Sequence, residues 1–330
     1  MQESTSQIIT LTSIGNYYLD GNRIGADLLE SLKYKGCKSI KFVDLTDEND
    51  QRVEKQYASS PYEWFDLLKE EGVIQLRLAY VRTDRNLTQE RMSSAFVGGA
   101  VRWLIEAVKP STSDVWEAKW EVHEQEEGQS SQWLVSYGRI SIDTSHFDNT
   151  ILSIQDAGAT LKHALKEIRD FSEIHTKTAF TQMFDKPITL LSGSMEYPGD
   201  EMVLAADHPS LHRIVLTAAS WASRVFGGMG SWNDISFEKR DDQEEYEELS
   251  NNLYNIINLS IIVAANPWPR PNLADTEDED YSSIHIHDIQ NSGGVKRRQK
   301  GGKRILAKFI FFAWLLLNIV LFGFGLIFGM

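Results

Sequence analysis

Two stretches in the middle of the chain, VWEAKWEV at residues 115–122 and QWLVSYGRISI at residues 132–142, decide the class of fold that the sequence predicts. Each alternates large apolar side chains with polar ones, the period of a β-strand with one buried face. The acidic loop EQEEGQSS at residues 124–131 separates them, so we expect an antiparallel pair. The pair also carries three tryptophans, for which core packing is the expected role and a binding groove is the alternative. They are Trp116, Trp120 and Trp133.

The residues before this pair predict strands and helices in alternation. Strands are expected at residues 7–12, 39–45 and 73–81, and helices at residues 24–32, 61–71 and 93–108. The helix at 61–71 has the clearest boundaries, with Ser60 as N-cap, Pro61 in the first turn and Gly72 at its end. The alternation of the two element types favours an α/β layer for residues 1–112.

The residues after the pair predict helices. They are expected at residues 154–184, 208–226 and 244–265. Gly227 closes the second of them, and we expect it in the left-handed conformation of a helix C-cap. Asn266 and Pro267 end the third, because a residue before proline avoids the helical region. Residues 113–266 then hold the strand pair and these helices, as a separate domain or as one domain with residues 1–112.

The last stretch of the chain, ILAKFIFFAWLLLNIVLFGFGLIFGM at residues 305–330, predicts a transmembrane helix. From Phe309 onward it has 22 residues and no charge. A bilayer core of about 30 Å takes roughly 20 helical residues to cross, so the stretch is long enough. The predicted fold class is thus α+β, with a mixed α/β N-terminal part, an antiparallel strand pair, a helical C-terminal half and one C-terminal transmembrane helix.

Seven basic residues immediately before and at the start of this stretch predict how the chain is oriented. Positive flanks stay on the cytoplasmic side of a membrane, so residues 1–304 are expected to be cytoplasmic in a single-pass, tail-anchored arrangement. Such a cluster can also attract anionic lipid, by about 1 kcal/mol per residue near the surface. Fixing the topology is the simpler role. The seven are Lys296, Arg297, Arg298, Lys300, Lys303, Arg304 and Lys308.

Residues 267–304 change from acidic to basic and predict a flexible tether between body and membrane. The seven basic residues account for 7 of the 33 Lys and Arg and for none of the 47 Asp and Glu. The rest of the chain therefore has 26 basic residues against 47 acidic ones. A body this acidic repels phosphate backbones, so nucleic acid is excluded as an expected partner.

One face of the predicted membrane helix has the pattern of a self-association surface. Gly325 and Gly329 have a Gly-x-x-x-Gly spacing, which lets two helix backbones approach closely. Asn318 falls on the same face and can form an interhelical hydrogen bond. The sequence therefore predicts a homodimer through the anchor. The alternative is that Asn318 bonds its own backbone and the glycines have no partner.

Two histidines have a spacing that can hold a metal ion. His208 and His212 are four residues apart at the start of a predicted helix, with Asp200 or Glu201 as a third ligand. The HExxH glutamate of zinc proteases is missing, and capping or surface roles are the alternative. The single cysteine, Cys37, allows neither an intramolecular disulfide nor a cysteine-rich zinc site.

A glycine-rich stretch, FGGMGSWND at residues 226–234, is the most distinctive motif in the chain. Such a loop can bind phosphate, but this one follows a helix and has no Gly-Lys-Ser/Thr end, so no cofactor is expected. Ser231 and Asp234 are weak catalytic candidates within it. Together with EEYEELSNNLYNIINLSIIVAAN at residues 244–266, this stretch resembles segments of uncharacterised bacterial proteins. The resemblance implies a recurring structural module and no particular function.

These patterns predict a membrane-tethered cytoplasmic protein that acts by binding another protein, as a regulatory or scaffold module. The alternative is a membrane-tethered hydrolase that uses His208 and His212 or the loop at 227–234. A motif that combines a nucleophile, a base and an orienting group is missing from the sequence, which favours binding over catalysis.

Overall fold

A computed structural model of the chain describes residues 3–32, 37–48, 51–82, 87–93, 101–123, 132–147, 152–176 and 180–267. The predicted tether beyond residue 267 and the predicted membrane helix at 305–330 lie outside these ranges. Within the described ranges, none of the helices combines the length and the apolar character needed to cross a bilayer.

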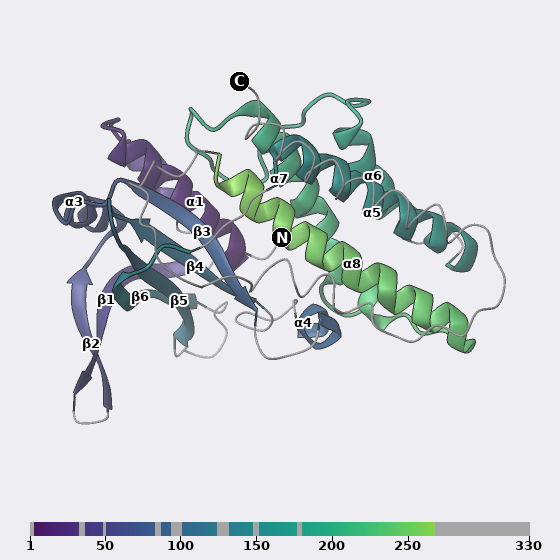
Figure 1. Cartoon of the computed structure of the whole chain (residues 1–330), viewed down its shortest axis with the longest axis horizontal. Helices are drawn as coiled ribbons and strands as arrows, with labels where there is room; N and C mark the ends of the chain where they lie inside the picture. The colour runs from purple at the N-terminus through teal and green to yellow at the C-terminus, as the bar shows by residue number, and fades with distance from the viewer. Residues whose placement is uncertain are drawn as a thin grey trace, which may run out of the picture. The chain divides into compact units, whose positions relative to one another are not determined.

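The described strands form one mixed sheet in the order β2-β1-β6-β5-β4-β3 (Figure 1). Neighbouring strands run antiparallel except β1 and β6, which are parallel. The predicted antiparallel pair is confirmed as β5 and β6, so the strands from residues 113–266 lie between strands from residues 1–112. The strands are β1 Cys37–Glu48, β2 Gln51–Ala58, β3 Gln75–Arg82, β4 Val101–Val108, β5 Ser113–His123 and β6 Gln132–Thr144.

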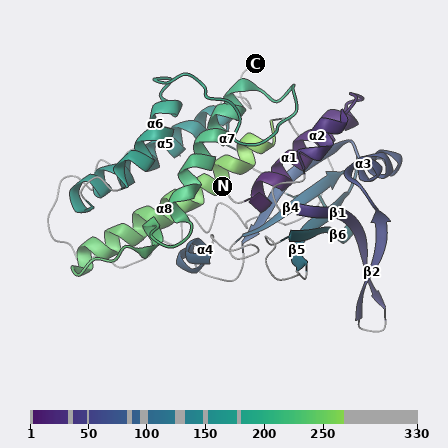
Figure 2. The same ribbon diagram turned by 180° about the vertical axis from the view of Figure 1, so that it is seen from behind.

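Eight helices and two short 3-10 turns complete the described part of the chain. The helices are α1 Glu3–Leu19, α2 Ala26–Glu30, α3 Pro61–Glu70, α4 Leu87–Ser93, α5 Ile154–His175, α6 Thr181–Leu191, α7 Ser210–Ser223 and α8 Arg240–Ala265. The 3-10 turns are η1 Arg224–Phe226 and η2 Trp232–Asp234. Helix α1 packs on β3 and β4, α3 packs on β1 and β2, and α5, α6, α7 and α8 pack on one another (Figures 1 and 2).

One face of the sheet carries most of the core. Phe42 of β1 stacks on Trp64 of α3 with ring centroids 4.4 Å apart, and Trp116 of β5 lies edge-on to both rings. All three side chains are fully buried, so the expected role in core packing is confirmed for Trp116. The opposite face has a much smaller apolar cluster around Leu104 and Val115. The sheet is therefore covered unequally on its two faces.

Local signals predicted α3 well. The Ser60 hydroxyl accepts a hydrogen bond from the Glu63 amide at 3.2 Å, and Pro61 occupies the first turn. Gly72 follows the helix with a φ of +81°, the left-handed region that glycine enters at low cost. The predicted N-cap and terminator are both confirmed.

Several predicted elements are wrong, and burial explains two of them. Residues 7–12 belong to α1 instead of a strand, and the predicted helix at 93–108 contains β4. Residues 7–12 are buried on every side, and so are residues 104–108 of β4, so neither run shows the polar face that reveals a period. Strand β2 was missed, and the helix predicted at 154–184 is interrupted between α5 and α6.

Candidate functional site

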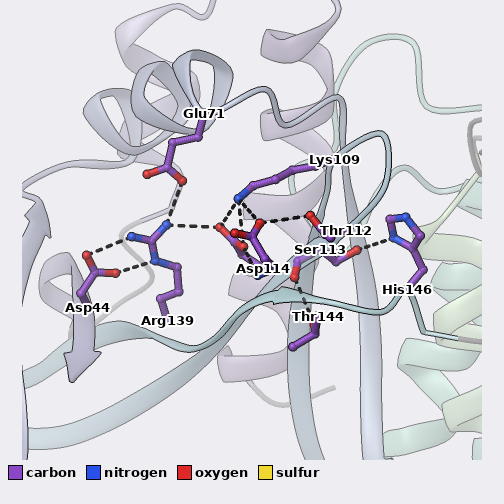
Figure 3. Close-up of polar contacts among 10 residues, drawn as sticks. Asp44, Glu71, Lys109, Thr112, Ser113, Asp114, Arg139, Thr144 and His146 are labelled. Atoms are coloured by element: carbon purple, nitrogen blue, oxygen red, sulfur yellow. Dashed lines mark hydrogen bonds and ion pairs between the residues drawn. The ribbon is translucent and has the colours of Figure 1, made fainter. Parts of the chain in front are cut away.

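A buried arginine organises the end of the sheet at which β1 and β6 finish. Arg139 of β6 pairs in register with Asp44 of β1, and its guanidinium donates to both oxygens of that carboxylate at 2.5 and 2.9 Å. It also donates to Glu71, just after α3, at 2.8 Å and to Asp114 of β5 at 3.2 Å (Figure 3). The Arg139 side chain is 9% exposed. Four elements therefore meet at one cation.

A second cation continues this cluster. Lys109 Nζ lies 3.0 Å from the carboxylate of Asp114 (Figure 3) and 3.1 Å from that of Asp143. The Thr112 hydroxyl donates to Asp143 at 3.0 Å, and the Asp143 amide donates to Asp114 at 2.9 Å. Asp143 has a φ of +50°, which is uncommon for a residue with a Cβ. Its backbone is held there by the fully buried Asp114 carboxylate.

The electrostatics of this cluster favour the charged forms of Arg139, Lys109 and Asp143. Burial alone would lower the pKa of Arg139, but the Asp44 hydrogen bonds and the nearby charge of Glu71 raise it above its ordinary value. The pKa of Lys109 is raised in the same way by Asp114 and Asp143, against the effect of burial. Hydrogen bonds from Lys109 lower the pKa of Asp143. The cluster is thus an arrangement of opposite charges, which suits cross-linking the sheet better than proton transfer.

The rings of Tyr57 and Trp116 both contact the guanidinium. Their centroids lie 4.6 and 5.4 Å from the central carbon of Arg139. Cation–π contacts of this kind are worth more when they are desolvated. The sequence held one signal for this site, because Arg139 falls on the same face of β6 as Val135 and Tyr137. A charged residue at an apolar position of the pattern indicates a buried partner, but the partners themselves could not be predicted.

A serine, a histidine and a glutamate meet beside this cluster. The Ser113 hydroxyl lies 2.6 Å from His146 Nδ1 (Figure 3), and it donates to Glu106 at 3.0 Å. In a hydrolytic triad the carboxylate supports the ring nitrogen remote from the serine. Here Glu106 is 3.8 Å from the same nitrogen that faces Ser113, and Ser113 is 1% exposed. The arrangement supports a buried hydrogen-bond network better than an accessible nucleophile.

The two candidate histidines lie together and face one carbonyl. His208 Nε2 is 3.0 Å from the oxygen of Ala264 at the end of α8, and His212 Nδ1 is 3.3 Å from the same oxygen. Burial lowers the pKa of His208 to about 4 and also lowers that of His212, so both rings are neutral at pH 7. A neutral imidazole bound to a carbonyl acts as a structural donor.

The proposed third ligands have other partners. Asp200 forms an ion pair with Arg213, and Glu201 forms one with Arg224. No group of three His, Cys, Asp or Glu side chains within the described ranges is arranged to hold a metal ion. The structure therefore brings His208 and His212 together without assembling a metal site around them in this part of the chain.

The remaining candidates in the glycine-rich loop cap the 3-10 turn η2. The Ser231 hydroxyl accepts from the Asn233 amide at 3.2 Å, and the Asp234 carboxylate accepts from the Ser231 amide at 3.1 Å. Such reciprocal capping satisfies backbone donors at the start of a turn. Ser231 is largely buried. The sequence analysis named Ser231 and Asp234 as catalytic candidates. In the structure, both side chains instead form hydrogen bonds that cap the turn.

The glycine-rich loop also corrects the predicted C-cap. Gly227 has a φ of −119° in extended conformation, whereas Gly228 and Gly230 both have a φ of +76°. Helix α7 ends in the 3-10 turn η1 at 224–226, which moves the left-handed position one residue along the chain. The prediction for Gly227 was therefore wrong by one residue.

Gly228→Ala should lower the free energy of unfolding by about 1 kcal/mol, because a Cβ is strained at positive φ. Gly227→Ala is the matched control, since its backbone is extended and the nearest atom to a new Cβ is 3.9 Å away. It should change stability by only a few tenths of a kcal/mol. Urea denaturation of residues 1–270 measures both. Equal losses for the two variants would contradict the assignment.

The same loop joins distant parts of the chain. Trp232 is fully buried and its Nε1 donates to Ser250 of α8 at 2.7 Å. The next residue, Asn233, donates to the carbonyls of Phe226 at 2.8 Å and of Arg91 at 3.1 Å. Arg91 of α4 is itself 1% exposed and reaches into this junction. The motif is therefore a structural junction between α4 and the helical half.

The two edges of the sheet differ. At the β3 edge, the Asn16 side-chain amide accepts from Leu76 N–H at 2.7 Å and donates to Leu76 C=O at 2.8 Å. The Asn266 amide makes the same pair of bonds to Leu78, at 2.8 and 2.7 Å. At the other edge, β2 pairs with β1 alone among the described strands.

The described part of the chain is thus an α+β protein with a mixed six-stranded sheet, a charged cluster at one end of it and two unlike edges. Comparison of the chain with family models, with curated proteins and with solved structures finds no match.

Proposed function

We propose that the chain is a membrane-anchored protein whose body binds an extended segment of another protein along strand β2. An extended segment can add to an exposed sheet edge through main-chain hydrogen bonds, with side-chain contacts supplying specificity. The observation that carries the proposal is the difference between the two sheet edges. The β3 edge is occupied by two asparagine amides, and among the described residues no backbone bond joins the outer edge of β2 to another segment.

Strand β2 has the side chains of a recognition edge. Val53 is 38% exposed, and Glu54, Lys55 and Gln56 are exposed as well. Glu54 lies 3.2 Å from Lys41 and 4.0 Å from Lys119, so the surface beside this edge carries both signs of charge. Charged side chains on an edge strand disfavour indiscriminate pairing. Such an edge suits a partner of complementary charge better than non-specific aggregation.

The proposed location rests on residues 305–330 and on the seven basic residues beside them. An uncharged stretch of this length fits a bilayer core, and the basic flank favours a cytoplasmic body. A flexible tether at 267–304 would let the body, and with it the β2 edge, reach partners over an area of the membrane surface. The partner is therefore expected at or near the cytoplasmic face of the same membrane.

One experiment tests both parts of this proposal. A photo-crosslinking amino acid is placed at Gln56 of β2, or at the exposed Lys166 of α5 as a control, in the full chain expressed in its own cells. We expect a covalent adduct with a protein in carbonate-washed membranes from the Gln56 variant alone. The same Gln56 variant ending at residue 270 should be recovered in the supernatant.

The outcomes separate the two parts. Adducts of equal yield at both positions, or none at Gln56, would contradict binding along β2. Recovery of the full chain in the supernatant would contradict the anchor. Aggregation of the chain that ends at residue 270 would show that the body needs its C-terminal segment to fold.

A further inference from the structure

The end of α8 is held by two sets of contacts, one with a pair of histidines and one with strand β3. The carbonyl oxygen of Ala264 lies 3.0 Å from His208 Nε2 and 3.3 Å from His212 Nδ1, within hydrogen-bonding distance of both rings. Two residues further on, Asn266 binds both backbone groups of Leu78 on the β3 edge. Asn266 and His208 are 9% and 3% exposed. The last turn of α8 therefore connects the histidine pair to an edge of the sheet.

We infer that the last turn of α8 acts as a releasable latch on the β3 edge. Protonation of His208 and His212 detaches this turn from the histidines. Asn266 then moves away from Leu78, and the β3 edge becomes free to pair with an added strand. The inference is independent of the binding proposed for β2, because it concerns the opposite edge of the sheet. It requires that the histidines be buried while the latch is closed and hydrated once it opens. The burial of His208 beneath Ala264 meets the first condition.

The charges around the pair oppose protonation in the closed state. Arg213 of α7 and the other histidine act against a positive charge on His208, whereas Asp200 acts in its favour. Asp207, next to His208 in the chain, faces Asp20 after α1, and the backbone carbonyls of Val263 and Ala264 on α8 favour the protonated form of His212. Burial is the largest effect, and it holds the pKa of His208 near 4.

The direction of the pH effect follows from linkage. A histidine whose pKa is lowered in the closed state stabilises that state above its ordinary pKa of about 6.5. This stabilisation is lost as the pH falls from about 6.5 towards 4. For His208 alone, the equilibrium constant for opening should rise about twenty-fold between pH 7 and pH 5.

The β3 edge supplies its own internal control. Leu78 N–H is held by Asn266, which follows α8, whereas Leu76 N–H is held in the same way by Asn16 of α1. Only the first bond depends on the last turn of α8. Acidification should therefore release the Leu78 amide and leave the Leu76 amide protected.

Residue-resolved amide exchange on the full chain in detergent micelles, with ¹⁵N-leucine and correction for intrinsic exchange, measures both amides. We expect the protection of Leu78 to fall about twenty-fold from pH 7 to pH 5 and that of Leu76 to stay constant. His208→Gln keeps an N–H donor without a titrating group, so it should remove most of this pH dependence. His163→Gln, at a histidine whose side chain is 62% exposed, should leave the pH dependence intact.

Three results would overturn the latch. The first is a parallel loss of protection at Leu76 and Leu78, which would mean that the whole edge opens together. The second is constant protection of Leu78 down to pH 5. The third is an unchanged pH dependence in His208→Gln. Because the first two are read from the unmodified chain, the test stands even if His208→Gln folds poorly.

Discussion

Replacing Arg139 with methionine should lower the free energy of unfolding by about 3–5 kcal/mol, the cost of leaving buried charges without their counter-ion. The change removes the partner of three carboxylates at once, and the side chain of Asp114 is 0% exposed. It also removes the cation that contacts the rings of Tyr57 and Trp116. Urea denaturation of residues 1–270 at pH 7 measures the loss.

Arg102→Met is the matched control for this prediction. Arg102 of β4 also makes two hydrogen bonds to one carboxylate, that of Glu117 on β5, both at 2.6 Å. Its side chain is 49% exposed, however, so water screens the pair. Exposed ion pairs are worth about 0–1 kcal/mol, and the control should lose no more than that. Similar losses for Arg139→Met and Arg102→Met would refute the claim that burial makes the Arg139 cluster essential.

A lysine at position 139 separates charge from geometry. Arg139→Lys keeps the positive charge, but a single ammonium cannot make the two parallel bonds to Asp44 or offer a planar group to the rings of Tyr57 and Trp116. We expect a loss between those of Arg139→Met and the wild-type chain. A lysine variant as stable as the wild type would show that charge alone accounts for the stability of the cluster.

Trp232→Ala should cost about 3–5 kcal/mol in the free energy of unfolding, as expected when a fully buried tryptophan is removed from a packed core. Its ring lies 5.2 Å from Phe180 and Phe184 and 5.4 Å from Tyr246, so the cavity would open where η2, α6 and α8 meet. The variant also leaves the Ser250 hydroxyl without the indole N–H. Urea denaturation of residues 1–270 is again the measurement.

Trp133→Ala provides the comparison within the same chain. Trp133 of β6 is only partly buried and contacts Trp120 edge-on at 6.2 Å. Its loss should therefore be smaller, about 1–2 kcal/mol. If Trp232→Ala costs no more than Trp133→Ala, the glycine-rich motif does not hold the helical half together. Its role as a binding loop would then have to be considered again.

Much of the regular structure was predictable, because its signals are local. The cap at Ser60 and the terminator at Gly72 bound α3, and alternating side chains on either side of an acidic loop indicated β5 and β6. The charged start and apolar end of the last helix predicted α8. These signals survive in a single sequence because each segment keeps one face in water or ends at a residue with a special backbone preference.

The candidate site was less predictable than the fold. Its arginine could have been noticed at an apolar position of β6, but Asp44, Glu71 and Asp114 come from elements up to 95 residues away in the chain. The pairing of His208 and His212 was visible from their spacing. Their shared contact with Ala264 was not, because it depends on how α7 packs on α8.

The sequence by itself thus determined the local elements, the acidity of the body and the uncharged C-terminal stretch with its basic flank. Only the tertiary structure decided that residues 7–12 are helical, that β1 lies parallel to β6, and that Asn16 and Asn266 occupy the β3 edge. Two physical reasons account for these cases. A segment buried on every side loses its polar face and with it the periodic signal, and a long-range hydrogen bond depends on where two segments meet in space.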